Sequence, residues 1–115
     1  MSRVGLILRA GSPEILDCAR RVLSWASEGG HEILVESASA ALLEWGGGDA
    51  SPQELVRLAN PIVSLGGDGT LLGIGRYVQE ESPILIGVNF GHLGFLTEIS
   101  PVEVISVIEH TLRGE

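Results

Sequence analysis

The sequence predicts a doubly wound α/β fold, a Rossmann- or flavodoxin-like parallel sheet with helices on both faces. Short apolar runs alternate with segments of helical period, serine-proline pairs open three of the helical segments, and a glycine-rich loop follows the third apolar run. Right-handed crossovers between parallel strands place helices on the sheet faces. Because 115 residues can bury one core, we expect a single domain over residues 1–115.

Each predicted element follows from a local pattern. Short apolar runs bounded by turn residues predict buried strands at residues 3–8, 31–36, 61–65 and 83–88. Helical spacing predicts helices at residues 13–28, 38–44, 52–59, 69–80 and 101–113. Ser12, Ser51 and Ser100 each precede a proline at a helix start, and Glu54 and Glu103 would complete capping boxes. The glycines of residues 46–50 predict the most flexible surface loop of the domain.

The first helix has two distinct faces. An apolar stripe should face the sheet, and it comprises Ile15, Leu16, Ala19, Val22, Leu23 and Ala26. The charged residues between them predict a solvated face rather than a site: Glu14, Asp17, Arg20 and Arg21. Trp25 and Trp45 are expected to pack at the core or its rim rather than to stack on bases.

Composition excludes several classes of function. Apolar residues make up 44% of the chain, charged residues 19%, and the net charge is −8. No apolar run approaches the roughly 18 residues of a membrane span, and the chain start does not resemble a signal peptide, so we expect a cytoplasmic protein without a membrane partner. The acidic balance argues against a nucleic-acid partner. A single cysteine, Cys18, excludes internal disulfides and cysteine-built zinc sites, and it is expected to be a buried thiol.

The glycine-rich loop, residues 66–70 (GGDGT), is expected at the carboxyl end of a strand, where open α/β sheets bind ligands. Its glycines permit close approach, and the amides of the next helix can bind an anion. A Walker-type phosphate loop is excluded because the chain has no lysine. The dinucleotide fingerprint also fails, since Leu72 stands where its third glycine would be and Asn89 where its acid would be, about 20 residues on.

Asp68 is the unusual residue of this loop. A carboxylate would repel phosphate, so it should meet a hydroxyl or a metal ion, and both belong to phosphoryl transfer. Alternatively, Asp68 is a turn aspartate that only caps the helix at Thr70 and beyond. Arg76, the one basic residue near the loop in sequence, could reach a phosphate or pair with Glu80.

A second unusual stretch, residues 87–98 (GVNFGHLGFLTE), follows the fourth strand and should reach the same edge of the sheet. Its glycines, asparagine, histidine and phenylalanines could form a wall for a planar base and bind a sugar. Phe95 and Leu96 could instead belong to the core. His92 is expected to be a loop hydrogen-bonding residue, and no partner is predicted for His31 or His110.

Together these stretches resemble the NAD kinase family, enzymes that phosphorylate NAD to NADP. The resemblance rests on residues 4–13 (VGLILRAGSP), 66–72 (GGDGTLL) and 87–99 (GVNFGHLGFLTEI). The GGDGT motif alone is less specific, since lipid kinases carry it and phosphofructokinases have a near copy. The second stretch makes the resemblance specific.

The resemblance implies a role for each motif residue. Asp68 would be the base for the 2′-hydroxyl of the adenosine ribose, which attacks the γ-phosphate of ATP, with Mg²⁺ carrying phosphate charge. Phe95 would pack on the base beside Leu96. The implied nucleotide-binding residues are Gly66, Gly67, Gly69, Thr70, Leu72, Arg76, Asn89, Phe95 and Leu96. Some relatives also accept polyphosphate as donor.

The resemblance covers the amino-terminal domain alone. Family members continue into a β-rich domain that grips NAD, so we expect this piece to have little activity by itself and the full-length protein to be a homo-oligomer. A lipid kinase domain would need a basic or apolar membrane-facing surface, which the acidic charge disfavours. A flavodoxin-like signalling module would need an acidic pair after the first strand, where Arg9 and its neighbours stand.

Overall fold

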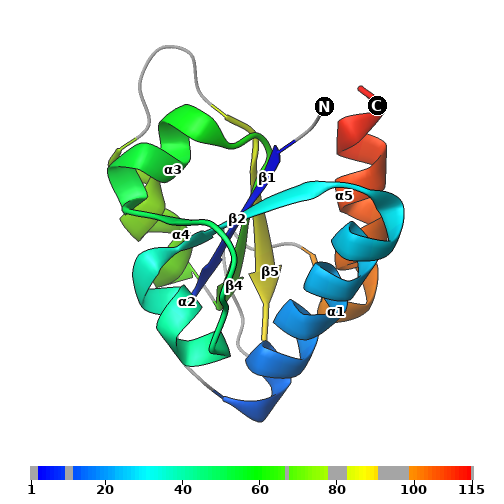
Figure 1. Ribbon diagram of the computed structural model, residues 1–115, viewed down its shortest axis with the longest axis horizontal. Helices are drawn as coiled ribbons and strands as arrows, with labels where there is room; N and C mark the ends of the chain where they lie inside the picture. Colours follow the sequence, from blue (N-terminus) through cyan, green and yellow to red (C-terminus); the bar gives the residue numbers. More distant parts are fainter. Residues whose placement is uncertain (1–2, 10–11, 67, 78–82, 91–98, 115) are drawn as a thin grey trace.

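The computed structural model describes residues 3–9, 12–66, 68–77, 83–90 and 99–114. Its centre is one parallel sheet with the strand order β3-β2-β1-β4-β5 (Figure 1). The strands are β1 (Arg3–Leu8), β2 (Glu32–Glu36), β3 (Asp49–Ala50), β4 (Ile62–Gly66) and β5 (Leu85–Asn89). The chain winds outward from β1 to β3 and then crosses to β4 and β5 on the other side. The predicted doubly wound sheet is confirmed, and its switch point lies between β1 and β4.

The helices lie close to their predicted positions. They are α1 (Pro13–Gly29), α2 (Ser37–Leu43), α3 (Pro52–Leu58), α4 (Asp68–Gly75) and α5 (Val104–Leu112). A short 3₁₀ turn, Pro101–Glu103, precedes α5, so the predicted helix at 101–113 begins with a tighter turn. All four predicted strands are also present, within two residues of their expected ends.

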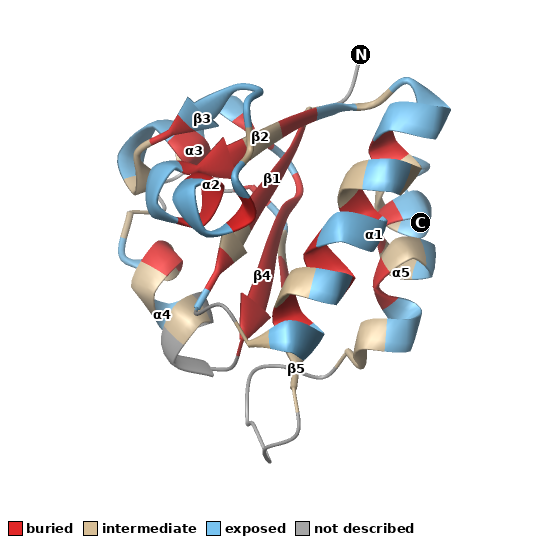
Figure 2. Ribbon diagram, turned by 60° about the horizontal axis from the view of Figure 1, so that its bottom comes forward, coloured by how far each residue is buried: buried red, intermediate tan, exposed pale blue. Residues whose placement is uncertain are grey.

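Helices cover both faces of the sheet, as Figure 1 shows. On one face α1 and α5 bury Ile15, Val22 and Ile108 against the strands, and all three side chains are inaccessible to solvent. On the other face Leu55 of α3 and Ile74 of α4 form a smaller core with Ala59 and Ile62. Burial is continuous along β4 and interrupted in β1 only at Arg3 and Ile7, which are partly buried (Figure 2). Two cores therefore hold the sheet from opposite sides.

Serine caps begin the helices as predicted. Ser51 Oγ accepts a hydrogen bond from the amide of Glu54 at 3.2 Å, and Glu54 Oε1 accepts one from the amide of Ser51 at 3.1 Å, which completes a capping box. Hydrogen bonds from the backbone amide and the side chain of Ser51 to the Glu54 carboxylate lower the pKa of Glu54. Glu103 likewise accepts from the amide of Ser100 at 3.1 Å.

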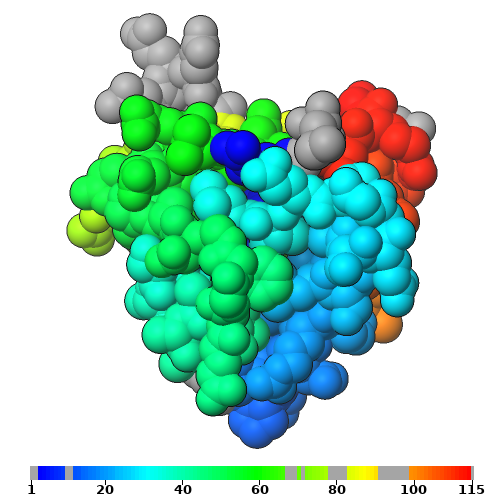
Figure 3. Space-filling model, viewed as in Figure 1, coloured from blue at the N-terminus to red at the C-terminus, as the bar shows by residue number. Residues whose placement is uncertain are grey.

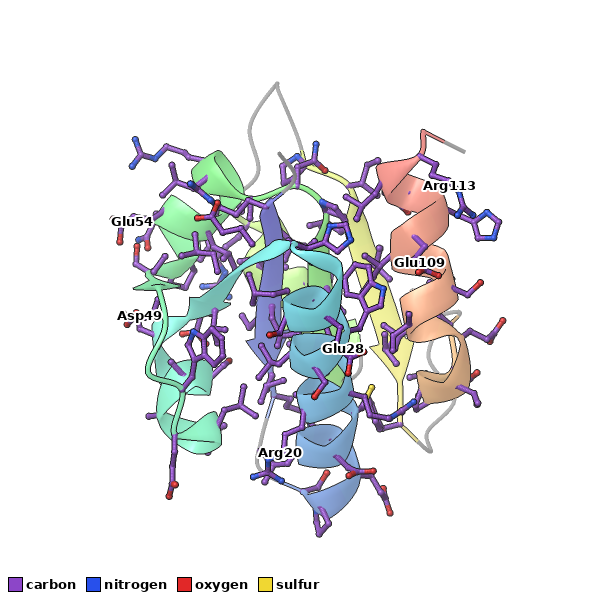
Figure 4. All side chains as sticks on the ribbon, turned by 45° about the vertical axis from the view of Figure 1, so that its right-hand side comes forward. Arg20, Glu28, Asp49, Glu54, Glu109 and Arg113 are labelled. Atoms are coloured by element: carbon purple, nitrogen blue, oxygen red, sulfur yellow. The ribbon has the colours of Figure 1, made fainter. Side chains whose placement is uncertain are left out.

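The predicted two faces of α1 are confirmed. Ile15, Ala19, Val22 and Ala26 are buried, and Leu16 and Leu23 pack beside them. The four charged residues named for its outer face are exposed, and Figure 4 shows Arg20 on this surface.

Trp25 joins α1 to α5 at the rim of the core. Its indole Nε1 donates to Glu109 Oε2 at 3.1 Å, and Figure 4 labels this glutamate on α5. The indole ring stacks on His31 with 4.5 Å between ring centroids. The packing role predicted for Trp25 is confirmed, and His31 has a partner that the spacing does not reveal.

Two expectations differ from the structure. Residues 46–50, expected as a loop, contain β3, which pairs Val35 with Asp49 and Glu36 with Ala50. A ladder of two residues is too short to leave an alternating pattern in the sequence. Helix α4 ends at Gly75 rather than continuing toward residue 80, in a stretch weakened by Gly73 and Gly75; residues 78–82 lie outside the described part.

A buried carboxylate begins α2 where no cap was predicted. Glu36 accepts hydrogen bonds from the amides of Ala38 at 2.9 Å and Ser39 at 3.0 Å, and from Ser39 Oγ at 2.7 Å. Ser39 Oγ in turn accepts from the amide of Leu8 at 2.8 Å. Because both residues are buried, this network fixes the end of β1 to the end of β2.

The second core should be sensitive to truncation at Leu55. Leu55→Ala removes a fully buried side chain and should lower the free energy of unfolding by about 2–5 kcal/mol. Leu58→Ala is the matched control on the same helix, because Leu58 is 44% exposed, and it should cost less than about 1 kcal/mol. Urea unfolding followed by circular dichroism measures both; equal losses would contradict the assignment of the core.

Cys18 should react slowly with alkylating reagents. Burial raises the pKa of its thiol more than the nearby Arg21 lowers it, so both access and thiolate formation are suppressed. At pH 8 the native chain should be labelled at least about a hundredfold more slowly than the urea-unfolded chain. Because the chain has one cysteine, mass spectrometry reports this site alone, and similar rates in the two states would show that the thiol is accessible.

Candidate functional site

The candidate site lies at the carboxyl edge of the sheet. Gly66, the last residue of β4, pairs with Asn89, the last residue of β5. The two glycine-rich stretches of the sequence therefore leave the sheet side by side, as predicted. The start of α1 lies at this same end of the molecule (Figure 1), and Figure 3 shows it in lighter blue at the bottom of the view. Open α/β sheets bind ligands at this edge.

Gly66 is in close contact with two other elements. A Cβ atom at this position would stand 2.7 Å from Arg9 Cβ and 2.7 Å from Thr70 Oγ1. Both distances are too short for carbon and oxygen atoms to tolerate, so only glycine fits without a shift of the chain. The absence of a side chain at residue 66 lets the end of β1 and the first turn of α4 meet over β4.

Helix α4 begins at Asp68, two residues after β4 ends. Its first amides therefore open at the carboxyl edge, where a helix start favours an anion. The structure describes the backbone of Asp68, while its carboxylate lies outside what is described. The position predicted for Asp68, at the junction of strand and helix, is confirmed for the backbone.

Thr70 and Ser64 bring two hydroxyl groups close to this junction. Ser64 Oγ and Thr70 Oγ1 are buried and have no hydrogen-bond partner among the described residues. Ser64 is fully buried in β4 and stands two residues before Gly66. Residues two apart in a strand lie on the same face, so Ser64 and Gly66 both face α3 and α4. Ser64 is the one polar residue in the apolar run at 61–65, which is the signal that could have singled it out.

Two arginines stand at different distances from the loop. Arg9 follows β1, is exposed, and lies directly against Gly66. Arg76 is also exposed but follows the last residue of α4. An eight-residue helix is about 12 Å long, so Arg76 lies at the opposite end of α4 from Asp68. Arg76 is the nearer residue in sequence, whereas the structure brings Arg9 to the loop.

The other predicted residues differ in how far they are described. Leu72 of α4 is 61% exposed, so its apolar side chain is available for contact. Asn89 is half-buried, and its backbone amide donates to Ile99 O at 2.8 Å. The chain thus leaves β5 at residue 90 and returns beside it at residue 99. Gly67, His92, Phe95 and Leu96 lie outside the described residues.

An open cavity of about 340 Å³ adjoins the end of β5. It is lined by Glu14, Asp17, Arg21, Asn89, Phe90 and Pro101. Arg21 Nη2 donates to Pro101 O at 3.3 Å across it. Asn89 lines this cavity, which lies on the α1 side, and it also pairs with Gly66 at the carboxyl edge. The cavity therefore adjoins the edge formed by Gly66.

The described residues offer no preformed metal centre and no membrane segment. Within the described ranges, no three His, Cys, Asp or Glu side chains converge on a point where a metal ion could sit. Helices in this part of the chain are too short or too polar to cross a membrane. At this edge the first amides of α4 and the side chain of Arg9 lie beside the backbone of Asp68, an arrangement that suits a phosphorylated ligand.

The chain has many curated relatives. It is 38% identical over 111 residues to the NAD kinase of Methylococcus capsulatus, covering 96% of this chain and 38% of that protein. It is 39% identical over 113 residues to the NAD kinase of Chromohalobacter salexigens, with the same two shares. The chain thus spans about two fifths of the length of the curated relatives it matches.

A solved structure confirms the fold independently. The crystal structure of yeast NADH kinase complexed with NADH superposes with a TM-score of 0.80 at 18% sequence identity. The match covers 98% of this chain and 38% of the yeast chain. At this identity the likeness concerns the fold.

The family model described as the ATP-NAD kinase N-terminal domain matches residues 4–115. This range contains both glycine-rich stretches and all of the sheet except Arg3, the first residue of β1. The chain therefore belongs to the ATP-NAD kinase family and corresponds to its N-terminal domain.

Proposed function

We propose that this chain is the phosphoryl-transfer domain of an NAD kinase, which moves the γ-phosphate of ATP to the 2′-hydroxyl of the adenosine ribose of NAD and so makes NADP. The observation that carries the proposal is the pairing of Gly66 with Asn89. The GGDGT loop and the second glycine-rich stretch begin at the neighbouring ends of β4 and β5, so ATP and NAD can meet at this edge of the sheet. Membership in the family supports NAD as the acceptor.

Asp68 is the proposed base. Its carboxylate orients the 2′-hydroxyl and takes its proton while the ribose oxygen bonds to the γ-phosphorus and the bond to ADP breaks. The start of α4 favours the ionised carboxylate and so makes it a weak base. A weak base suffices, because the proton leaves late in a loose phosphoryl-transfer transition state. The capping role considered from the sequence would leave no group to orient the hydroxyl.

The proposed nucleotide site extends along both loops. Gly66, Gly67 and Gly69 leave room for phosphates, and the amide at Thr70 belongs to the first turn of α4. The exposed side chain of Leu72 supports an apolar contact with NAD. Asn89, Phe95 and Leu96 are proposed to hold the base and ribose from the second loop. The phosphate contact expected of Arg76 from the sequence would lie at the far end of α4, away from the start of the GGDGT loop.

A divalent cation, expected to be Mg²⁺, would enter with ATP and neutralise charge on the transferred phosphate. Kinases hold this ion with one or two carboxylates, water and the substrate phosphates, rather than with a cage of protein side chains. Because Asp68 is assigned to the ribose hydroxyl, water and the phosphates of ATP would hold the ion.

The activity is proposed for the full-length protein, because the relatives are longer than this chain. In the family pattern a second, β-rich domain holds NAD in place, so this chain alone should turn over little. We propose a cytoplasmic homo-oligomer. The family match and the net charge of −8 argue against a lipid acceptor at a membrane surface. A signalling module is disfavoured by the same match.

Replacing Asp68 should abolish NADP formation. Asp68→Asn keeps the shape of the side chain but cannot take a proton, and we expect at least a thousandfold loss of kcat, on the scale of a lost catalytic group. Asp49→Asn is the matched control, because Asp49 is exposed on β3 at the far edge of the sheet (Figure 4).

An enzyme-coupled NADP assay on the full-length protein with NAD, ATP and Mg²⁺ measures both variants. Normal turnover by the Asp68 variant would remove its role as base. No turnover by the unaltered protein with any phosphoryl donor would overturn the proposed function itself.

A further inference from the structure

Among the described residues, Arg9 is the one arginine whose side chain begins against the start of the GGDGT loop. A Cβ at Gly66 would stand 2.7 Å from Arg9 Cβ, so the stem of the arginine side chain lies on the backbone of the loop. The amide of Arg9 donates to Leu65 O at 3.0 Å, which continues the pairing of β1 with β4 beyond the last strand residue. Arg9 therefore marks the switch point of the sheet.

The alternation of β1 places Arg9 on the α4 side of the sheet. Leu6 and Leu8 are buried in the core beneath α1 and α5. Ile7 packs with the opposite core beneath α3 and α4, and Arg9 shares its parity. Thr70, which approaches Gly66 from α4, stands on this same side. The side chain of Arg9 thus leaves the sheet on the same side as the start of α4.

The backbone that carries Arg9 is held in place. The preceding residue, Leu8, donates its amide to Ser39 Oγ at 2.8 Å, and Ser39 is fixed by the buried carboxylate of Glu36. Glu36 itself accepts three hydrogen bonds from Ala38 and Ser39. The acid at the end of the neighbouring strand is therefore already occupied, and Arg9 makes no ion pair with any described residue.

An exposed arginine with no ion-pair partner among the described residues suits an anionic ligand. The chain carries a net charge of −8, and the loop contains Asp68, so a polyphosphate would otherwise meet repulsion at this edge. A guanidinium binds phosphate oxygens with two parallel hydrogen bonds. Arg76 stands at the far end of α4 and cannot fill the same place.

We propose that Arg9 binds the terminal phosphates of the phosphoryl donor at the switch point between β1 and β4. This inference rests on the proposed function of the same edge, and it assigns the phosphate-binding cation to the end of β1 rather than to α4. Arg9 acts through its fixed position and charge, so it affects the donor and leaves the binding of NAD unchanged.

The test compares the KM values of the two substrates in the full-length protein. Arg9→Ala should raise the KM for ATP roughly 10- to 100-fold, as expected for loss of a charged hydrogen-bonding partner, while the KM for NAD stays within about twofold. Arg9→Lys should recover part of the loss, because it keeps the charge but not the paired geometry. Arg57→Ala, an exposed arginine of α3, is the matched control and should change neither KM.

Direct binding separates this inference from the proposed function. Calorimetry with the non-hydrolysable analogue AMP-PNP and Mg²⁺ should show the same weakening for Arg9→Ala, whether or not the protein turns over NAD. An unchanged AMP-PNP affinity, or a rise in the KM for NAD alone, would overturn the assignment of Arg9 to the donor. Urea unfolding of each variant checks that the fold is intact; if Arg9→Ala is destabilised, Arg9→Gln replaces it under the same criteria.

Discussion

The carboxyl edge of this domain depends on the contact that Gly66 makes with Arg9 and Thr70. β4 is paired on both sides and buried along its whole length, so its end cannot move away from a crowded neighbour. A side chain at residue 66 would collide with both contact atoms at 2.7 Å. Because residue 66 has no side chain, the end of β4 can lie in contact with Arg9 and with the first turn of α4. This geometry makes the edge suitable for a phosphorylated ligand.

Tertiary packing determines which parts of the fold the sequence could predict. The four longer strands were predictable because strands buried on both faces appear as continuous apolar runs. The Ser51–Glu54 capping box was predictable because it needs local spacing alone. β3 was not, because its two residues are held by pairing with β2 rather than by their own composition. Glu36 was not predicted as a cap because glutamate is not among the residues preferred at that position, although Ser39 is close in sequence. Leu8, which donates to Ser39, is brought there only by folding.

The candidate site shows the same division. The meeting of Gly66 and Asn89 could be predicted, since parallel strands end at a common edge. The role of Arg9 could not, because nothing local relates it to a loop almost sixty residues away in sequence. Arg76 is close to the loop along the chain, but α4 carries it away. Closeness in sequence to the loop is thus a poor guide to which arginine contacts it, whereas strand order and register show that Arg9 does.

The central claim is that Asp68 meets the 2′-hydroxyl of NAD at the edge formed by Gly66 and Asn89. A crystal structure of the full-length protein with NAD, AMP-PNP and Mg²⁺ tests it most directly. The account predicts the adenosine 2′-oxygen within about 3 Å of the Asp68 carboxylate and in line with the terminal phosphate of the analogue. A ribose bound away from this edge, or an Asp68 carboxylate turned back onto the amides of α4, would contradict it.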